Sequence, residues 1–306
     1  MPESLKLDFK PVTIDDYDRI YPYTSVYGEG SCQHSPVSMY SLREKYGDAV
    51  CIKDGFLYTL RTNLCDDIFR VYLAPLGGGD LKAAFGNIIS DAREHGRRVK
   101  FLSLTQKYAE ALGELFPGSF DIKEERDIAE YMFKSEVMAY FTGPELSKRR
   151  REVNSFWHKY GDRASVDRIV PEDMPDIMRF EKRWLAQSKE NHDMAALERE
   201  SRMIRDQLEH FERLHLSGIV IRIDEVIFGF GYGTRLGDLC YDAIIEKGDR
   251  NIPYIYKVLR SESVKQCGLD CTYVNMEEDV GIPGLRALKS AYKPAYLINK
   301  FIATER

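Results

Sequence analysis

An internal duplication constrains the fold of this 306-residue sequence more than any other feature. Each half shows the same order of expected elements: strand, acid-capped helix, hairpin, strand, glycine-containing loop, helix, strand, helix and strand. The hairpins have apolar runs on either side of Asp54-Gly55 in the first half and Asp224-Glu225 in the second. A repeat of about 150 residues is a normal domain size. The order therefore predicts a duplicated α/β (α+β) protein, with a mixed central sheet flanked by helices in each half.

The expected elements pair across the two halves. In the first half they occupy residues 7–20, 49–60, 69–73, 76–80, 81–95, 99–104, 107–115 and 119–122. Their counterparts occupy residues 166–180, 218–229, 239–245, 247–251, 252–267, 271–275, 282–291 and 295–301. Two segments lie outside the repeat, a basic connecting helix at 144–160 and an inserted helix at 194–216. We therefore predict two domains, at residues 1–143 and 144–306.

The composition excludes several classes of protein. Lys and Arg number 44 against 49 Asp and Glu, a net charge of -5, so nucleic acid or anionic lipid would need a local basic patch. No apolar run approaches the roughly 20 residues of a membrane-spanning helix. Residues 1–8 lack the basic and apolar regions of a signal peptide, and the six cysteines show no disulfide framework. We expect a cytoplasmic protein with reduced thiols and at most peripheral membrane contact.

Several motifs of the sequence resemble a known family. They are Leu76-Gly-Gly-Gly-Asp-Leu, Phe101-Leu-Ser-Leu-Thr, Lys148-Arg-Arg-Arg-Glu-Val-Asn-Ser-Phe and the long segment 274–294. The order of elements is that of the GCN5-related N-acetyltransferase fold, and two such units in tandem are the architecture of the Fem-type aminoacyltransferases. Over nearly the whole chain, the motifs are similar to the C-terminal domain of phosphatidylglycerol lysyltransferases.

This resemblance implies an acyltransferase of the aminoacyltransferase class. It would move an aminoacyl group from aminoacyl-tRNA to a phospholipid headgroup, without a further cofactor. Lipid lysyltransferases also carry a multi-span membrane module that this sequence lacks, so another small polar acceptor stays open. Because aminoacyl-tRNA is an activated ester, the enzyme has to position two substrates, remove a proton and stabilise an oxyanion.

An acidic cluster follows the expected strand at 271–275. It contains Asn275, Glu277, Glu278 and Asp279 and precedes the start of a helix. Carboxylates at this place would face a cleft at the carboxyl ends of the strands. We expect one of the three acids to be the base. The alternative is that they only cap the helix and favour its positive end.

A basic and aromatic set continues along that helix. Arg286 and Lys289 are three residues apart and share a face, and Tyr292 falls close to it. The two cations are candidates for binding a phosphate of tRNA or lipid, and Tyr292 for donating a hydrogen bond to the oxyanion or the leaving hydroxyl. The alternative is a solvated basic helix end that complements the dipole.

The loop at 247–251 enters a helix where acetyltransferases bind the pyrophosphate of coenzyme A. Gly248 and Arg250 are the candidate ligands in this loop. The loop lacks a second glycine and carries Asp249, which disfavours coenzyme A. In the first half, Asp80 follows three glycines, and helix capping is its expected role.

The densest positive patch is the run Lys148, Arg149, Arg150 and Arg151, followed by Asn154 one turn later. Contiguous cations with nearby aromatic residues suit phosphate contact and base stacking on tRNA, or a lipid headgroup surface. The structural alternative is a solvated helix face.

Other patterns narrow the chemistry. No Cys or His pair has the spacing of a metal site, and we expect none. Gly229, Gly231 and Gly233 alternate within a strand, which indicates a bulge or the close approach of another group. Two alternatives to the aminoacyltransferase remain: an acyl-coenzyme A dependent N-acyltransferase, and a non-catalytic protein that binds RNA or another ligand.

Overall fold

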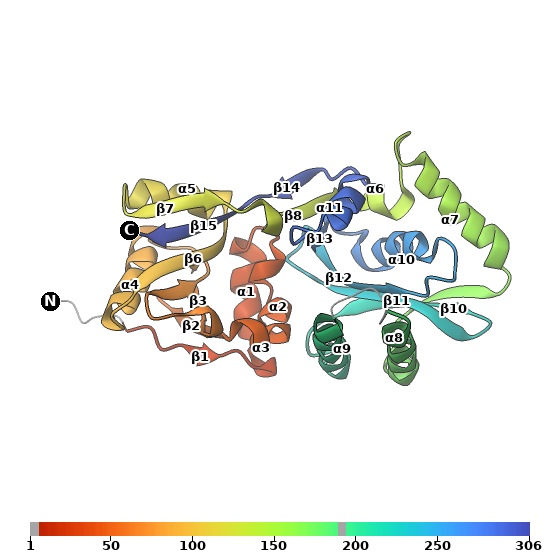
Figure 1. Ribbon diagram of the computed structural model, residues 1–306, viewed down its shortest axis with the longest axis horizontal. Helices are drawn as coiled ribbons and strands as arrows, with labels where there is room; N and C mark the ends of the chain where they lie inside the picture. The colour runs from red at the N-terminus through yellow and green to blue at the C-terminus, as the bar shows by residue number, and fades with distance from the viewer. Residues whose placement is uncertain (1–5, 189–193) are drawn as a thin grey trace. The chain divides into compact units, whose positions relative to one another are not determined.

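The computed structural model describes residues 6–188 and 194–306 (Figure 1). The chain forms two compact units, each built from separate segments. Unit 1 contains the residues up to Tyr131, then Glu278–Lys289 and Leu297–Arg306, and unit 2 contains Met132–Glu277 and Ser290–Tyr296. Two mixed sheets with flanking helices confirm the predicted fold class.

The first sheet lies in unit 1 and has the strand order β1-β2-β3-β4-β6-β15-β7, with β5 beside β3. Among the described residues, β4 and β6 run parallel, whereas β15 is antiparallel to both of its neighbours. The strands are β1 (Lys10–Pro11), β2 (Asp48–Lys53), β3 (Phe56–Arg61), β4 (Phe69–Tyr72), β5 (Leu76–Gly77), β6 (Arg98–Thr105), β7 (Phe120–Glu124) and β15 (Lys300–Glu305). The helices are α1 (Tyr17–Tyr27), α2 (Pro36–Ser41), α3 (Arg43–Tyr46), α4 (Leu81–Glu94) and α5 (Gln106–Leu115).

Local sequence explains the elements of unit 1. The β2–β3 hairpin turns at Asp54 and Gly55, which both have positive φ, as predicted. The Asp80 side chain accepts a hydrogen bond from the Ala83 N–H at 3.1 Å, which confirms its capping role. Phe85 lies on the buried face of α4 and packs edge-to-face against Phe101 of β6, with the two ring centroids 5.4 Å apart. These contacts fix α4 against the sheet.

The second sheet has the order β14-β8-β13-β12-β11-β10-β9. Its strands are β8 (Glu130–Lys134), β9 (Ala164–Arg168), β10 (Ser217–Ile223), β11 (Val226–Arg235), β12 (Cys240–Gly248), β13 (Tyr273–Glu278) and β14 (Tyr296–Ile298). The remaining helices are α6 (Ser135–Tyr140), α7 (Ser147–Tyr160), α8 (Met174–Ser188), α9 (Met194–Glu209), α10 (Ile255–Ser263) and α11 (Pro283–Ser290). Within unit 2, α8 and α9 lie on one face of this sheet and α10 on the other (Figure 1).

The glycines of β11 have the predicted structural roles. The pairing of β11 with β12 shifts register between Tyr232 and Gly233, which is a bulge. A Cβ atom on Gly233 would lie 1.8 Å from the carbonyl oxygen of Asp242, and one on Gly229 would lie 3.1 Å from Leu259 of α10. Only glycine permits these close approaches without a shift of neighbouring atoms.

Three expected elements differ from the structure. The closing strand predicted at 295–301 is wrong as one element, because β14 joins the second sheet and β15 joins the first, between β6 and β7. The inserted helix ends at Glu209 instead of residue 216, since hydrogen-bonded turns follow and His215 has positive φ. The helix expected at 252–267 begins at Ile255, after the left-handed Tyr254, and ends in a π-helical turn.

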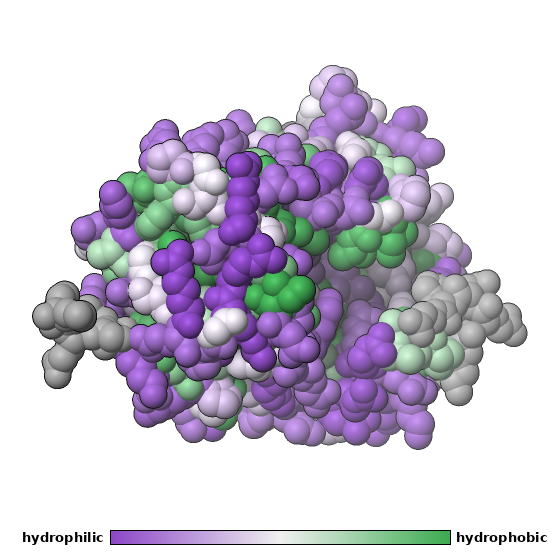
Figure 2. Space-filling view, turned by 60° about the vertical axis from the view of Figure 1, so that its left-hand side comes forward, coloured by the Kyte–Doolittle hydropathy of each residue, from purple (hydrophilic) through white to green (hydrophobic). Residues whose placement is uncertain are grey.

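The described helices and surface can be compared with what a membrane-spanning segment requires. No helix in the described ranges is long and apolar enough to cross a bilayer. On the face shown in Figure 2, hydrophilic side chains cover most of the surface and apolar ones form small patches between them.

Candidate functional site

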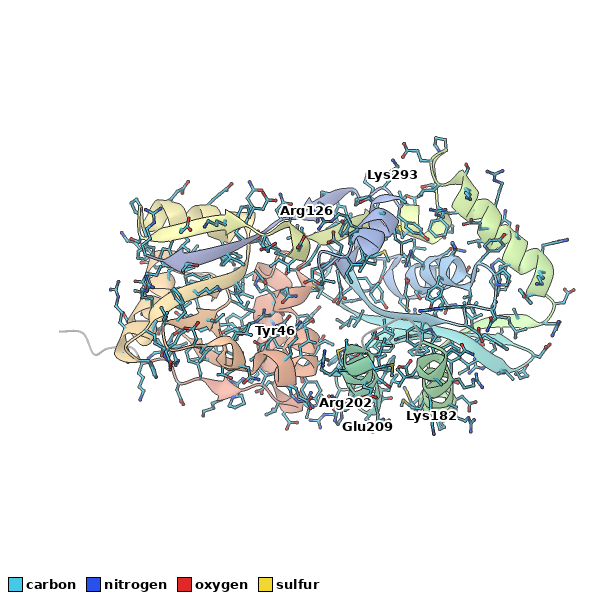
Figure 3. All side chains as sticks on the ribbon, viewed as in Figure 1. Tyr46, Arg126, Lys182, Arg202, Glu209 and Lys293 are labelled. Carbon is cyan, nitrogen blue, oxygen red and sulfur yellow. The ribbon has the colours of Figure 1, made fainter. Side chains whose placement is uncertain are left out.

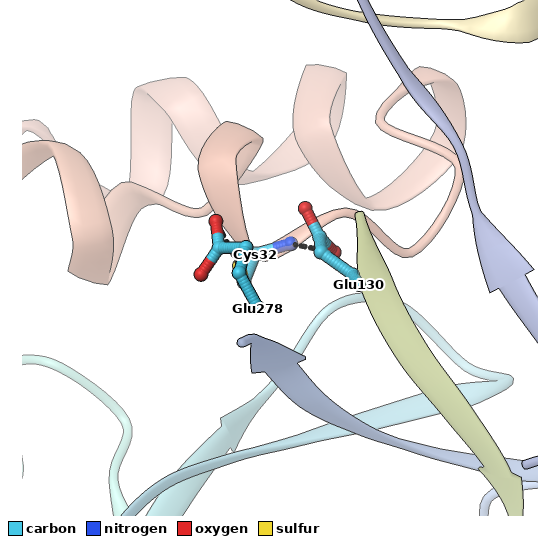
Figure 4. A group of neighbouring side chains, drawn as sticks. All are labelled: Cys32, Glu130 and Glu278. Atoms are coloured by element: carbon cyan, nitrogen blue, oxygen red, sulfur yellow. Dashed lines mark hydrogen bonds between the residues drawn. The ribbon is translucent and has the colours of Figure 1, made fainter. Parts of the chain in front are cut away.

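A buried cluster of charged side chains lies in unit 1 (Figure 4). Glu130, at the start of β8, and Lys300, at the start of β15, form an ion pair of 2.6 Å, and both side chains are fully enclosed. The Ser31 hydroxyl donates to Glu130 Oε1 at 2.7 Å, and the Cys32 N–H donates to Oε2 at 3.0 Å. Separate segments of the chain thus build one polar centre.

Glu278, at the end of β13, is the second carboxylate of this centre. The Gln33 amide donates to its Oε1 at 2.5 Å, and Arg61 in turn donates to the Gln33 carbonyl at 2.8 Å. Burial raises the pKa of Glu278, and the negative charge of Glu130 acts in the same direction, while Gln33 and Lys300 oppose it. Glu278 is partly accessible, whereas Glu130 is not. A carboxylate with a raised pKa and access to solvent is suited to accept a proton.

Asp279 has a different environment from Glu278. It is fully enclosed and accepts hydrogen bonds from Arg286 at 2.8 and 2.9 Å, from Tyr131 at 2.6 Å and from Arg126 at 3.1 Å. The Gly281 N–H adds another at 3.0 Å. These bonds, led by those of Arg286, hold the pKa of Asp279 well below its usual range. Asp279 is therefore a weak base, and its hydrogen bonds to Gly281 and Arg286 hold the loop before α11 in place.

Replacing Asp279 by Asn should lower the free energy of unfolding at pH 7 by about 1.5–3 kcal/mol, because charge-assisted hydrogen bonds are removed. The folded-state pKa is depressed, so this contribution is present above the unfolded value of about 3.9 and disappears as the pH falls below it. Urea unfolding at pH 7 and pH 3 should show the difference between the two proteins narrowing in acid.

The matched control for that experiment is Asp127→Asn. Asp127 binds the same Arg286 at 2.7 Å but is 55% exposed, so its replacement should cost less than about 1 kcal/mol. Equal effects of both variants would contradict the bracing role of Asp279.

The other residues of the predicted acidic cluster lie in unit 2. Asn275 is fully buried, and its side-chain oxygen accepts a hydrogen bond from the Glu277 N–H at 2.8 Å. Glu277 is half-buried and has a positive φ of 56°. Asn275 thus stabilises the backbone of the last residues of β13.

The predicted basic and aromatic set, with Arg286 and Lys289 on α11 and Tyr292 just after it, is divided between different environments. Arg286 is engaged by Asp279 and Asp127, so its charge is largely compensated. The Lys289 ammonium donates to the Glu278 carbonyl at 2.5 Å. Tyr292 is buried in unit 2, with its ring 4.6 Å from the Arg260 guanidinium.

The basic run on α7 is spread around the helix, as its 3.6-residue period requires. Lys148, Arg151 and Asn154 are the more accessible members. Arg150 donates to the carbonyl oxygens of Phe141 and Gly143, and Arg149 lies 5.3 Å from the Tyr292 ring. Half of the cationic run therefore holds local structure.

The loop after β12 is packed against α10. A Cβ atom on Gly248 would lie 2.8 Å from Ile255, so its glycine serves close packing of strand and helix. Arg250 is exposed, with its guanidinium 5.5 Å from the Trp184 ring.

Three side chains of the unit 1 centre come close enough to share a cation. One ligand atom each of Cys32, Glu130 and Glu278 lies within 4.8 Å of the others. Lys300 already supplies a positive charge to Glu130, so a metal ion would have to displace its ammonium.

The sequence motifs point to Glu278 but not to its partners. Those partners are Ser31, Cys32, Gln33, Glu130 and Lys300, and none of them lies in a motif that predicts a site. A signal was present in two of them, because Glu130 and Lys300 are charges placed next to apolar strand residues. Such residues are rarely buried unless they are paired.

Known proteins share this fold and its sequence pattern. Residues 24–304 match the family model for the C-terminal region of phosphatidylglycerol lysyltransferase. Among curated protein sequences, none matches the chain significantly.

Solved structures share the fold over almost the whole length. A conserved protein of unknown function from Bacteroides thetaiotaomicron is 26% identical with a TM-score of 0.90, covering 98% of this chain and 100% of that one. L-PGS from Bacillus licheniformis is 14% identical with a TM-score of 0.66, covering 98% and 94%. FemX is 9% identical with a TM-score of 0.60, covering 98% of each chain. By its family match, the chain belongs to the family of phosphatidylglycerol lysyltransferase C-terminal domains.

Proposed function

We propose that this protein is an aminoacyltransferase that moves an aminoacyl group from aminoacyl-tRNA to a phospholipid headgroup or another small polar acceptor. The family match supports the reaction class. The observation that carries the proposal is the partly accessible carboxylate of Glu278, held by Gln33 and with its pKa raised by burial. A cytoplasmic location belongs to the proposal, because aminoacyl-tRNA is made there.

In the proposed reaction, Glu278 accepts a proton from the acceptor hydroxyl or amine as that atom attacks the ester carbonyl carbon. The tetrahedral oxyanion then expels the terminal ribose hydroxyl of tRNA, which takes up the proton from Glu278. The Glu130–Lys300 pair and the Gln33–Arg61 contact keep the base in position. No step needs a covalent enzyme intermediate or a further cofactor.

The two alternative functions, a coenzyme A dependent acyltransferase and a non-catalytic binding protein, require different properties of the protein. Coenzyme A binding would need free backbone N–H groups at the loop after β12, and the packing of Gly248 against Ile255 does not favour it. A non-catalytic binding protein would retain tRNA or lipid affinity with no turnover.

The test is a transfer assay with tRNA charged with a mixture of radioactive amino acids, in the presence and absence of phosphatidylglycerol vesicles. Label in the lipid extract that disappears with Glu278→Gln would support the proposal and identify the amino acid. Label in an aqueous product would indicate a small polar acceptor instead. Absence of transfer from any charged tRNA would overturn the proposal.

The more accessible cations of α7 are the proposed tRNA contact. The double variant Lys148→Ala, Arg151→Ala should weaken binding of charged tRNA and lower the slope of log affinity against log salt by about one for each phosphate that is no longer neutralised. Filter binding at salt concentrations from about 50 to 200 mM measures both the affinity for charged tRNA and its salt dependence. Arg149 and Arg150 are left intact because they hold local structure.

The control pair for this measurement is Lys10→Ala, Lys123→Ala, whose side chains are 69% and 76% exposed in unit 1. This variant removes the same number of charges and should keep the salt slope. An identical salt slope in both double variants would contradict the proposed contact between α7 and tRNA.

A further inference from the structure

The short segment of unit 1 that follows Glu278 carries an apolar surface that faces solvent. Residues 279–282 form a turn between β13 and α11 (Figure 1). Val280 in this turn is 59% exposed, Ile282 is 53% exposed, and Leu288 of α11 is 45% exposed. Three large, exposed apolar side chains thus lie within nine consecutive positions. A concentration of this kind on a protein surface indicates an interaction site, whereas single scattered apolar residues do not.

The polar and apolar faces of α11 are reversed relative to an ordinary surface helix. Such a helix packs its apolar side chains on the core and exposes its charges. In α11, Arg286 instead binds Asp279 and Asp127, and the Lys289 ammonium donates to the Glu278 carbonyl. The exposed residues of α11 in unit 1 carry no charge; they are Pro283, Gly284, Ala287 and Leu288. The cations therefore attach the helix to its unit, and the apolar face is left to solvent.

The turn before α11 holds Val280 in a backbone conformation that a valine disfavours. The Ile282 N–H donates to the Asp279 carbonyl at 2.9 Å, and the two central residues, Val280 and Gly281, have φ of 46° and 74°. Turns with positive φ at both central positions usually carry Asn, Asp or Gly there, and a β-branched residue is strained. Hydrogen bonds to the Asp279 carboxylate, one of them from Arg126 (Figure 3), hold the turn. Burial of Val280 does not offset the strain, and strain of this kind is concentrated at functional sites.

A phospholipid bilayer is the partner that fits these features. Glu278, the proposed base, lies two residues before Val280, so a partner on this surface lies beside the segment that carries the base. The charged groups of the segment and its contacts match in number: Arg126, Arg286 and Lys289 against Asp127, Glu278 and Asp279. The surface thus offers apolar contact without net charge. Apolar side chains of peripheral proteins reach about 5–10 Å into the boundary between headgroups and acyl chains, where the lipid acceptor of the proposed reaction lies.

We infer that Val280, Ile282 and Leu288 insert into the headgroup boundary of a phospholipid bilayer and bring the Glu278 segment to the membrane surface. The inference rests on the proposed function for the choice of a lipid acceptor over another small polar one. It adds the contacts by which the protein meets the membrane that holds this acceptor.

Vesicle sedimentation with the full chain tests the inference. The vesicles contain equal parts of phosphatidylcholine and phosphatidylglycerol, and about 0.5 M salt screens the attraction of surface cations for the lipid. The unmodified protein should stay bound, and Ile282→Ser with Leu288→Ser should weaken binding at least about tenfold, because two apolar side chains no longer insert. The matched control, Val26→Ser with Ile68→Ser, changes side chains that are 69% and 53% exposed in unit 1 and should bind as the unmodified protein does. Absence of binding by the unmodified protein, or equal binding by both double variants, would overturn the inference.

Val280→Asn separates membrane contact from a role in the fold. Asn accepts a left-handed φ more readily than Val does, so this variant should raise the melting temperature by about 1–4 °C. The same variant should weaken vesicle binding, because an apolar side chain is lost. A lower melting temperature with unchanged vesicle binding would show that Val280 serves the fold and would contradict the inference.

Two further measurements distinguish a bilayer from other partners. The added fluorescence of Ile282→Trp should shift to shorter wavelength with vesicles and be quenched by lipids brominated in their acyl chains, whereas that of Ile68→Trp should not. If the unmodified protein sediments as a dimer in the ultracentrifuge and Ile282→Ser with Leu288→Ser sediments as a monomer, the surface is an interface between two copies and the inference fails.

Vesicle binding is measured without tRNA, so its outcome is separate from that of the transfer assay. Protein that binds vesicles through this surface but transfers no aminoacyl group would contradict the proposed function alone. Transfer to an aqueous product by a protein that binds no vesicles would contradict the membrane contact alone.

Discussion

Replacing Lys300 by Met is expected to lower the free energy of unfolding by about 3–5 kcal/mol, because the carboxylate of Glu130 is then left buried without its partner. Both side chains of the pair are fully enclosed at an N–O distance of 2.6 Å. Met keeps most of the volume of the lysine side chain, so removal of the charge is the main change. Urea unfolding at pH 7, followed by circular dichroism, measures the effect.

Two further variants separate the effect of the unpaired Glu130 charge from other effects of the Lys300 substitution. Lys107→Met breaks an ion pair with Glu29 of 3.8 Å in which the lysine is 59% exposed, and it should cost less than about 1 kcal/mol. Adding Glu130→Gln to Lys300→Met removes the uncompensated charge and should recover part of the stability. A Lys300 variant as stable as the Lys107 variant would contradict the role of the pair.

Glu278→Gln is expected to lower the transfer rate by about 10²- to 10⁴-fold, the usual contribution of a general base. Its effect on the free energy of unfolding should be small, because Gln has nearly the same shape. The rate of the unmodified protein should rise with pH as Glu278 loses its proton. Burial raises the pKa of Glu278, so this rise lies at higher pH than for an ordinary glutamate.

Gln33→Leu tests the pKa independently of the base itself. The Gln33 hydrogen bond lowers the pKa of Glu278, so its removal should move the rising limb of the pH–rate profile to still higher pH. Single-turnover rates from pH 4.5 to 8.5 give the profile. A large drop in rate for Glu277→Gln with little change for Glu278→Gln would contradict the assignment of Glu278 as the base.

The sequence was sufficient for most elements of the fold, because hairpins and caps are local. Positive φ at Asp54 and Gly55, and the cap at Asp80, depend on residues within a few positions of one another. The place of β15 in the first sheet could not be predicted in this way. Its short apolar run, Phe301–Ala303, is compatible with either sheet. The choice of sheet depends on contacts with residues about 200 positions earlier, such as the pairing of Phe101 with Ala303.

The environments of the site residues also could not be predicted from the sequence. Three adjacent acids were identified from the sequence, yet their environments differ completely. Glu278 binds Gln33, Asp279 binds two arginines and a tyrosine, and Glu277 lies near the end of β13 with a positive φ. Gln33, which binds Glu278, and Tyr131 and Arg126, which bind Asp279, come from segments about 150 to 250 residues away in the chain. Charge runs are similarly ambiguous, since only the fold separates Lys148 and Arg151 from Arg150, which binds backbone carbonyls.

The place of β15 has a consequence for synthesis of the chain. Because β15 pairs with both β6 and β7, the first sheet is interrupted until residues 300–305 have left the ribosome. During translation, β6 and β7 present unpaired edges of the kind that promote aggregation. Completion of the first sheet therefore requires the whole of unit 2 to be made, and deletion of residues 300–305 would leave β7 without the strand that joins it to β6.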